Sequence, residues 1–152
     1  MAYGKKYHMN WTTPTADCRL WIKQEGYASA STELTPATQA FQLTWGEQER
    51  QDLTLPMEVS TGRIRFVGDS QGEMVQEIFD GGETEYQVKF WRDAGSGYQL
   101  EWQGFLATDL WRDNPHRDAD IVELEVLDGL ALLENRDTDL QIDDDFDKTT
   151  NL

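Results

Sequence analysis

Basic side chains are scarce in this chain, and their scarcity argues against two large classes of partner. The 152 residues contain 13 Lys and Arg against 29 Asp and Glu, which gives a formal net charge of −16 at pH 7. A field of that sign repels the phosphate backbone of nucleic acids and the anionic headgroups of lipids. We therefore expect no specific nucleic-acid binding and no membrane association.

Cysteine and histidine are also rare. The single cysteine, Cys18, rules out a disulfide within the chain, and it shares an alternating apolar face with Leu20 and Ile22. We expect a buried thiol there rather than a reactive one. His8 and His116 lie in separate segments, and neither stands beside a cluster of metal-ligating residues. The sequence predicts no metal site and no cofactor.

Long apolar runs are missing as well. The first 25 residues hold no continuous apolar stretch of the kind found in secretory signals, and no run has the length of a membrane span. We expect the chain to be made and kept in the cytosol unless a larger particle carries it out.

No motif has the spacing of an active site. The stretch Gly95-Ser96-Gly97 lacks the helix and lysine that follow a phosphate-binding loop. The run from Asp143 to Asp147 lacks the glycine and the distal glutamate of a calcium loop. Carboxylates are so numerous that no single pair stands out as catalytic. We predict that the protein is not an enzyme.

The dominant period of the apolar residues is two, which is typical of strands that bury one face. This pattern predicts a mostly-β fold, a single β-barrel or sandwich of about seven strands with one or two short helices. The segment 27–40 is small and polar and is expected to form a loop. The expected strands cover residues 3–11, 18–22, 41–45, 62–68, 86–92, 98–106 and 121–126.

Two segments break this period. A helical stripe spaced i, i+1, i+4 and i+5 predicts a helix that begins after Asp69 or Ser70 and ends at 80–82. The run 130–133 is expected to form a second short helix or a turn. A hairpin loop is predicted at 93–97. The residues of the stripe are Met74, Val75, Ile78 and Phe79.

The composition changes at Arg136, which divides the chain into a folded domain, 1–135, and an acidic C-terminal tail, 136–152. Six aspartates in this tail surround three isolated apolar residues, Leu140, Ile142 and Phe146. An acidic tail is not expected to pack on its own acidic domain. We expect these apolar side chains to anchor the tail on a neighbouring chain.

The six tryptophans are spread over most of the predicted strands. Trp91 directly follows Phe90, so the two rings point to opposite faces of one strand. One face is the core, and the other is either a protein interface or a platform for a sugar. We favour the interface. The tryptophans are Trp11, Trp21, Trp45, Trp91, Trp102 and Trp111.

The order of these elements resembles the N-terminal β-barrel domain of bacteriophage tail hub and baseplate (tail-tip) proteins. A strand, a short helix, two paired strands and a last strand closing on Asp-Gly follow in the order typical of that family. The opening 2–7 is also similar to tail proteins of phages and prophages of Bacteroidetes-type bacteria. The short motifs that carry the resemblance are Trp102–Leu106, Phe105-Leu106-x-x-Asp109-Leu110 and Asp128–Leu133.

The resemblance implies a structural component of a virion tail, assembled in the host cytoplasm. Such a protein forms or joins a ring between tail tube and tip, with other tail or baseplate proteins and copies of itself as partners. The alternative is a carbohydrate-binding β-sandwich that recognises the host surface. Gly104, Asp128 and Gly129 are expected to shape turns. The expected interface residues are Trp91, Trp102, Phe105, Trp111, Leu140, Ile142 and Phe146.

Overall fold

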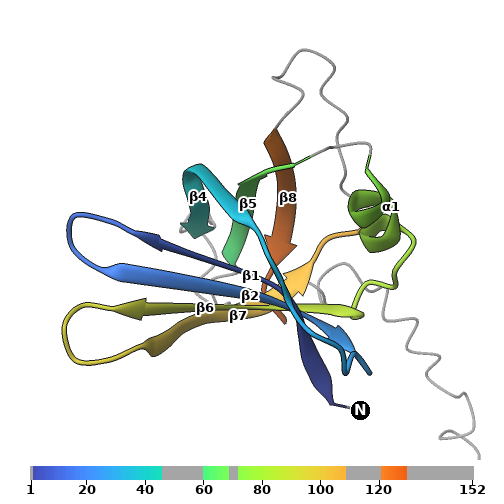
Figure 1. Cartoon of the computed structure of the whole chain (residues 1–152), viewed down its shortest axis with the longest axis horizontal. Helices are drawn as coiled ribbons and strands as arrows, with labels where there is room; N and C mark the ends of the chain where they lie inside the picture. The colour runs from blue at the N-terminus through green and yellow to red at the C-terminus, as the bar shows by residue number, and fades with distance from the viewer. Residues whose placement is uncertain (1, 46–59, 69–71, 109–120, 130–152) are drawn as a thin grey trace, which may run out of the picture.

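The computed structural model describes residues 2–45, 60–68, 72–108 and 121–129, which form eight strands and one helix. All strands belong to one sheet with the order β3-β1-β2-β6-β7-β8-β5-β4 (Figure 1). The mostly-β prediction is confirmed, with eight strands instead of about seven. The elements are β1 (Tyr3–Thr12), β2 (Asp17–Glu25), β3 (Thr32–Glu33), β4 (Thr35–Trp45), β5 (Ser60–Val67), α1 (Glu73–Phe79), β6 (Tyr86–Asp93), β7 (Gln99–Leu106) and β8 (Ile121–Leu127).

Alternation in the sequence becomes alternation between core and surface. On β2, Cys18, Leu20 and Ile22 are buried, as expected, and the residues between them are not. On β8, Val122, Leu124 and Val126 are buried in the same way. One face of each strand therefore contributes to a common core.

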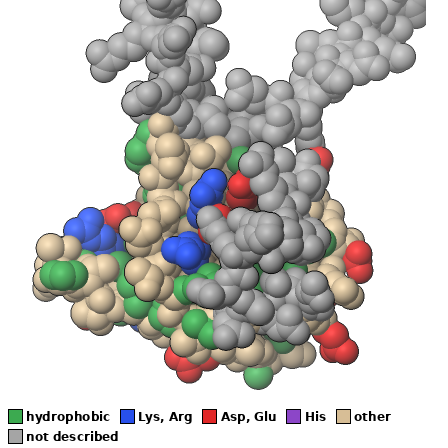
Figure 2. All heavy atoms as spheres, turned by 90° about the horizontal axis from the view of Figure 1, so that it is seen from above, with side chains coloured by type: hydrophobic (Ala, Val, Ile, Leu, Met, Phe, Trp, Pro, Cys, Tyr) green, Lys and Arg blue, Asp and Glu red, His purple; other side chains and the backbone are tan. Residues whose placement is uncertain are grey.

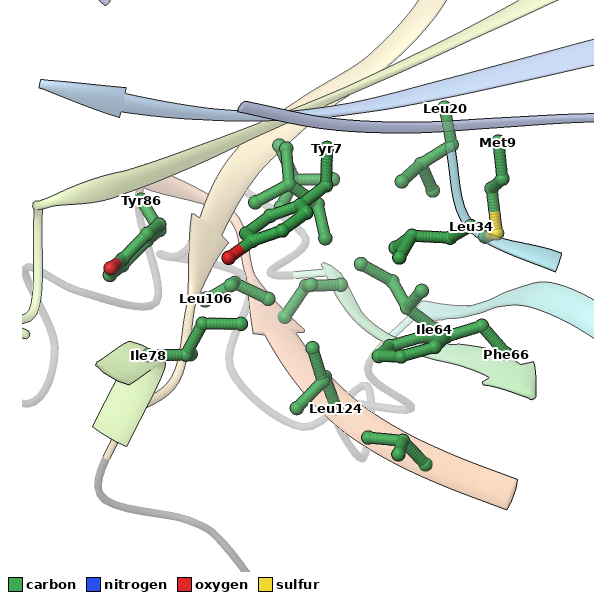
Figure 3. Close-up of a cluster of buried hydrophobic side chains, with 14 of the residues drawn as sticks. Tyr7, Met9, Leu20, Leu34, Ile64, Phe66, Ile78, Tyr86, Leu106 and Leu124 are labelled. Atoms are coloured by element: carbon green, nitrogen blue, oxygen red, sulfur yellow. The ribbon is translucent and has the colours of Figure 1, made fainter. Parts of the chain in front are cut away.

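The sheet bends at β7, which pairs with β6 along most of its length but with β8 only at Phe105 and Leu106. The hairpins β1–β2 and β6–β7 extend side by side, while β4, β5 and β8 lie above them in Figure 1. Figure 3 shows the core between these two parts, with Leu20 and Met9 pointing down from one part toward Ile64 of the other.

A single segment supplies both edges of the sheet. β3 pairs in parallel with β1, and after Leu34 the chain continues as β4, which pairs with β5. No ladder joins β3 to β4, so the sheet of the described residues is not closed into a barrel. The expected loop at 27–40 is therefore wrong in its second half. The small polar residues there form strands because two partners, β1 and β5, satisfy their backbone groups.

Helix α1 confirms the predicted helical stripe, and Val75 and Ile78 are its buried residues. Its N-cap is Gly72 rather than Asp69 or Ser70, which lie outside the described residues, and its C-cap is Asp80. Figure 1 shows α1 at one end of the sheet, where Ile78 enters the core. The expected second helix at 130–133 and the acidic tail lie outside the described residues.

The predicted hairpin loop at 93–97 joins β6 to β7. Gly95 and Gly97 adopt positive φ angles of 117° and 100°, which side-chain-bearing residues rarely adopt. The Asp93 carboxylate accepts hydrogen bonds of 2.8 Å and 3.0 Å from their backbone N–H groups. The aspartate and the two glycines together fix the turn.

Candidate functional site: a cationic-aromatic face

The outer face of the sheet collects side chains from four strands. The register places Trp21 of β2 between His8 of β1 and Lys89 of β6. One step along the sheet, Trp91 of β6 lies between Arg19 of β2 and Leu100 of β7. We call this surface the cationic-aromatic face; it comprises Lys5, Arg19, Trp21, Lys23, Lys89, Trp91, Tyr98 and Leu100.

Two tryptophans form the centre of this face. Trp21 and Trp91 are diagonal neighbours across the β2–β6 pair, and their ring centroids lie 4.4 Å apart at an interplanar angle of 56°. Neighbouring Phe90 points the other way and packs at 4.7 Å from Phe41. The rings of residues 90 and 91 thus lie on opposite faces, as the sequence predicts.

Cations lie over two aromatic rings of the face, those of Trp21 and Tyr98. Lys5 Nζ lies 4.8 Å from the ring centroid of Trp21, and the Arg19 guanidinium lies 5.8 Å from it. The same guanidinium lies 3.9 Å from the ring of Tyr98. These distances are within the range of cation–π attraction. Because cations occupy the ring of Trp21 and the two indoles are tilted, they do not form the open flat platform that stacks on a sugar.

The four cations of the face have no carboxylate partner within the part of the chain that the structure describes. Among the described residues, neither Lys5, Arg19, Lys23 nor Lys89 forms an ion pair, although the chain carries 29 acidic residues. Burial, followed by repulsion from Lys89, lowers the pKa of Lys23. The face is a local concentration of positive charge that the described part of the chain does not neutralise.

On the face of the molecule drawn in Figure 2, basic side chains lie near acidic ones, and further acidic side chains are scattered along the edge of the described part. Asp17 and Asp93 stand opposite each other in the backbone register at one end of the β2–β6 ladder, at the border of the face. The net negative charge therefore coexists with a positive surface.

The cationic-aromatic face also exposes large apolar side chains. Tyr98 and Leu100 are 40% and 49% exposed, which is unusual for large hydrophobic side chains. A surface that combines unpaired cations with exposed aromatic and aliphatic groups suits a partner carrying carboxylates and apolar side chains together.

Two of the predicted interface residues lie on this side of the sheet. Trp91 belongs to the cationic-aromatic face, and Phe105 of β7 is half-buried, with its ring 6.5 Å from that of Tyr3. Trp111 lies outside the described residues, as do the tail anchors Leu140, Ile142 and Phe146. Sequence reasoning did not select Trp21 or the four cations, because β1, β2 and β6 bring them together only in the folded sheet.

Trp102 lies in the core of its own chain, in contrast to the expected interface. It is 5% exposed, and its ring is 5.7 Å from that of Phe41. Its Nε1 donates a 2.9 Å hydrogen bond to Oγ of buried Ser60. The side chain is enclosed because β7 turns the face bearing Trp102 toward β5, which leaves it almost no surface for a partner.

The predicted turn residues have different roles. Gly104 lies within β7, where an added Cβ would collide with the Leu127 carbonyl oxygen and the indole of Trp102. Asp128 follows β8 and accepts hydrogen bonds from the N–H and the hydroxyl of Ser60, at 2.6 Å and 2.9 Å. At Gly129 a Cβ would have open space, and its φ is not in the left-handed region, so the backbone gives no reason for glycine.

A buried lysine, Lys6, lies at the centre of a cluster of titratable groups separate from the cationic-aromatic face. Lys6 is paired with Glu77 of α1 and donates a 2.8 Å hydrogen bond to Gln24. Its ammonium also lies within 6 Å of three tyrosine rings, those of Tyr7, Tyr27 and Tyr86. Every polar contact of Lys6 is internal, so this cluster fastens α1 to β1 rather than forming an open site.

The described part of the chain also has a shallow groove on the other half of the sheet. Polar side chains of β4, β5 and β8 line it, among them Gln42, Thr61, Arg63 and Glu125. No aromatic ring is among the described residues that line it. The groove lacks the stacking surface expected of a sugar site.

The described residues bring no three potential metal ligands together. No helix among them has the length and apolar character needed to cross a bilayer. No protein-family model, curated protein or solved structure matches this chain.

Proposed function

We propose that this protein is a structural component of a phage tail tip or baseplate, where it forms or joins a ring through protein–protein contacts. The observation that carries the proposal is the cationic-aromatic face, where cations without an ion-pair partner among the described residues lie beside exposed apolar groups. Protein interfaces are enriched in such aromatic and arginine side chains. The assignment to a virion tail rests on the resemblance of the sequence alone.

A protein partner fits this face better than a sugar or a nucleic acid. Lys5 and Arg19 cover Trp21, so its ring is not free to stack on a pyranose. A net charge of −16 opposes the approach of a polyanion such as DNA over longer distances. A protein segment with carboxylates set among apolar side chains carries a lower charge density than DNA and offers both kinds of group that the face can contact.

The mass of the purified chain in solution, by light scattering, tests the assembly. We expect a multi-copy particle whose mass falls in Trp91→Ala. The control is Trp45→Ala, which removes a 57% exposed tryptophan from β4. A monomer at every concentration, or equal effects of both substitutions, would contradict the proposal.

Electron microscopy of virions from the strain that carries the gene tests the place of the protein. An antibody raised against the chain should label the end of the tail. Label on the capsid, or virions without any label, would exclude a tail-tip component. Specific binding of a glycan that is lost in Trp91→Ala would favour the carbohydrate-binding alternative.

A further inference from the structure

We infer that the cationic-aromatic face binds the acidic segment 136–152 of a second copy of the chain. This inference rests on the proposed function, because it names the partner in the proposed assembly. It starts from the uneven distribution of charge. Four cations on one face lack a carboxylate partner among the described residues, and the eleven residues 137–147 hold six aspartates and no basic residue.

The chemistry of the segment matches that of the face in two respects. Its six aspartates outnumber its two basic residues, Arg136 and Lys148, so it carries the charge that the face lacks. Its apolar residues Leu140, Ile142 and Phe146 are interspersed with these aspartates. Exposed aromatic and aliphatic groups on the face provide contacts for them, and the neighbouring aspartates supply carboxylates for the cations.

Repulsion between the cations of the face favours an anion further. Burial, and then repulsion from Lys89, lowers the pKa of Lys23, and an approaching carboxylate offsets that repulsion. Lys5 and Arg19 lie over aromatic rings that hold them in place before a partner arrives. Such pre-positioned cations lose less side-chain entropy on binding than freely rotating ones.

Binding of this kind is heterologous, because a face on one copy meets a segment on the next. A heterologous contact between identical chains generates a closed ring or an open filament. A single surface and a single segment are then sufficient to build the proposed ring. Added salt weakens such an assembly because it screens the charges.

The test uses two full-length variants and a mixture of them. The face variant, Lys23→Glu with Lys89→Glu, reverses two cations. The segment variant, Asp143→Asn with Asp144→Asn and Asp145→Asn, removes three charges. Light scattering and sedimentation should show that each variant alone associates about tenfold more weakly than the parent chain or worse. Circular dichroism checks that both remain folded.

Mixing identifies the contact. The face variant keeps its acidic segment and the segment variant keeps its face, so the mixture should form one-to-one pairs. Arg63→Glu is the control for the face, because it reverses a half-exposed cation on β5. The control for the segment neutralises three exposed carboxylates elsewhere, with Glu33→Gln, Glu73→Gln and Glu83→Gln. Both controls should assemble like the parent chain.

Four results would overturn the inference, and the first of them separates it from the proposed function. If the face variant dissociates but the segment variant assembles normally, the face is an interface with another occupant and the proposed function stands. If the mixture stays monomeric while the parent assembles, the segment does not bind a second copy. If a single-stranded DNA oligonucleotide binds the parent chain but not the face variant, the face is a nucleic-acid site. A parent chain that is monomeric throughout contradicts both proposals.

Discussion

The indole Nε1 of Trp102 donates a 2.9 Å hydrogen bond to the hydroxyl oxygen of Ser60. That hydroxyl donates in turn to the Asp128 carboxylate, at 2.9 Å. Ser60 and Trp102 are both buried, so each link replaces a bond to water that folding removed. These two successive hydrogen bonds link β7 to the start of β5 and to the residue that follows β8.

Ser60→Ala should lower the free energy of unfolding by about 1–3 kcal/mol, because it leaves the buried indole N–H without an acceptor. Urea unfolding followed by tryptophan fluorescence measures the change. The control is Ser29→Ala, at an exposed position between β2 and β3. Equal effects of the two substitutions would show that the hydrogen-bonded chain does not stabilise the fold.

Gly104→Ala should destabilise the protein by about 1–3 kcal/mol, since the methyl group overlaps the Leu127 carbonyl and the indole of Trp102. Thermal unfolding measures the loss. Gly82→Ala is the matched control, because a Cβ there meets nothing within 4 Å. A Gly104→Ala variant as stable as Gly82→Ala would mean that β7 and β8 separate at little cost.

Alkaline pH should destabilise the fold through a buried tyrosine. Burial, and then the Glu77 carboxylate, raise the pKa of Tyr7 from its ordinary value of 10.0 to about 12. The unfolded chain then loses its tyrosine proton at lower pH than the folded protein. The stability from this group is complete below about pH 10 and is lost as the pH rises toward 12.

Urea unfolding at a series of alkaline pH values checks this dependence. Tyr7→Phe should reduce the slope of the free energy of unfolding against pH above pH 10. Tyr98→Phe, which changes an exposed ring, should leave that slope unchanged. Tyr86 shares the Lys6 cluster and its pKa is raised too, chiefly by burial, so some dependence should persist in Tyr7→Phe. An unchanged slope would assign the alkaline loss of stability to other groups.

Asp93→Ala should destabilise the β6–β7 hairpin by about 1–2 kcal/mol, because its carboxylate bonds two backbone N–H groups in the loop. Thermal unfolding gives the change in stability. Ser96→Ala, at an exposed position of the same loop, serves as control. Identical melting temperatures for the two variants would show that the glycines alone determine the turn.

Much of the fold follows from local pattern. Alternation predicts which residues share a face of a strand, so the buried set Cys18, Leu20 and Ile22 is found as expected. The i, i+4 spacing of the apolar residues predicts α1, and the two glycines near Asp93 predict the hairpin. These features depend on a few neighbouring residues and on no distant contact.

Other features depend on which strands meet. Alternation does not say which of two faces is enclosed, and Trp102 is buried because β7 bends toward β5. Pairing of β2 with β6 brings together residues about 70 positions apart, and this creates the Trp21–Trp91 contact. The strands at 32–40 lack apolar alternation and exist because β1 and β5 pair with them.

The short link at Leu34 has a consequence for unfolding. One continuous stretch, from Thr32 to Trp45, pairs with β1 at its start and with β5 at Thr35, Pro36 and residues 41–45. Neither half of the molecule can open widely without pulling this stretch from the other. Amide hydrogens of β1 and β5 should therefore exchange with solvent in one concerted event, as a single cooperative unit rather than as two independently opening halves.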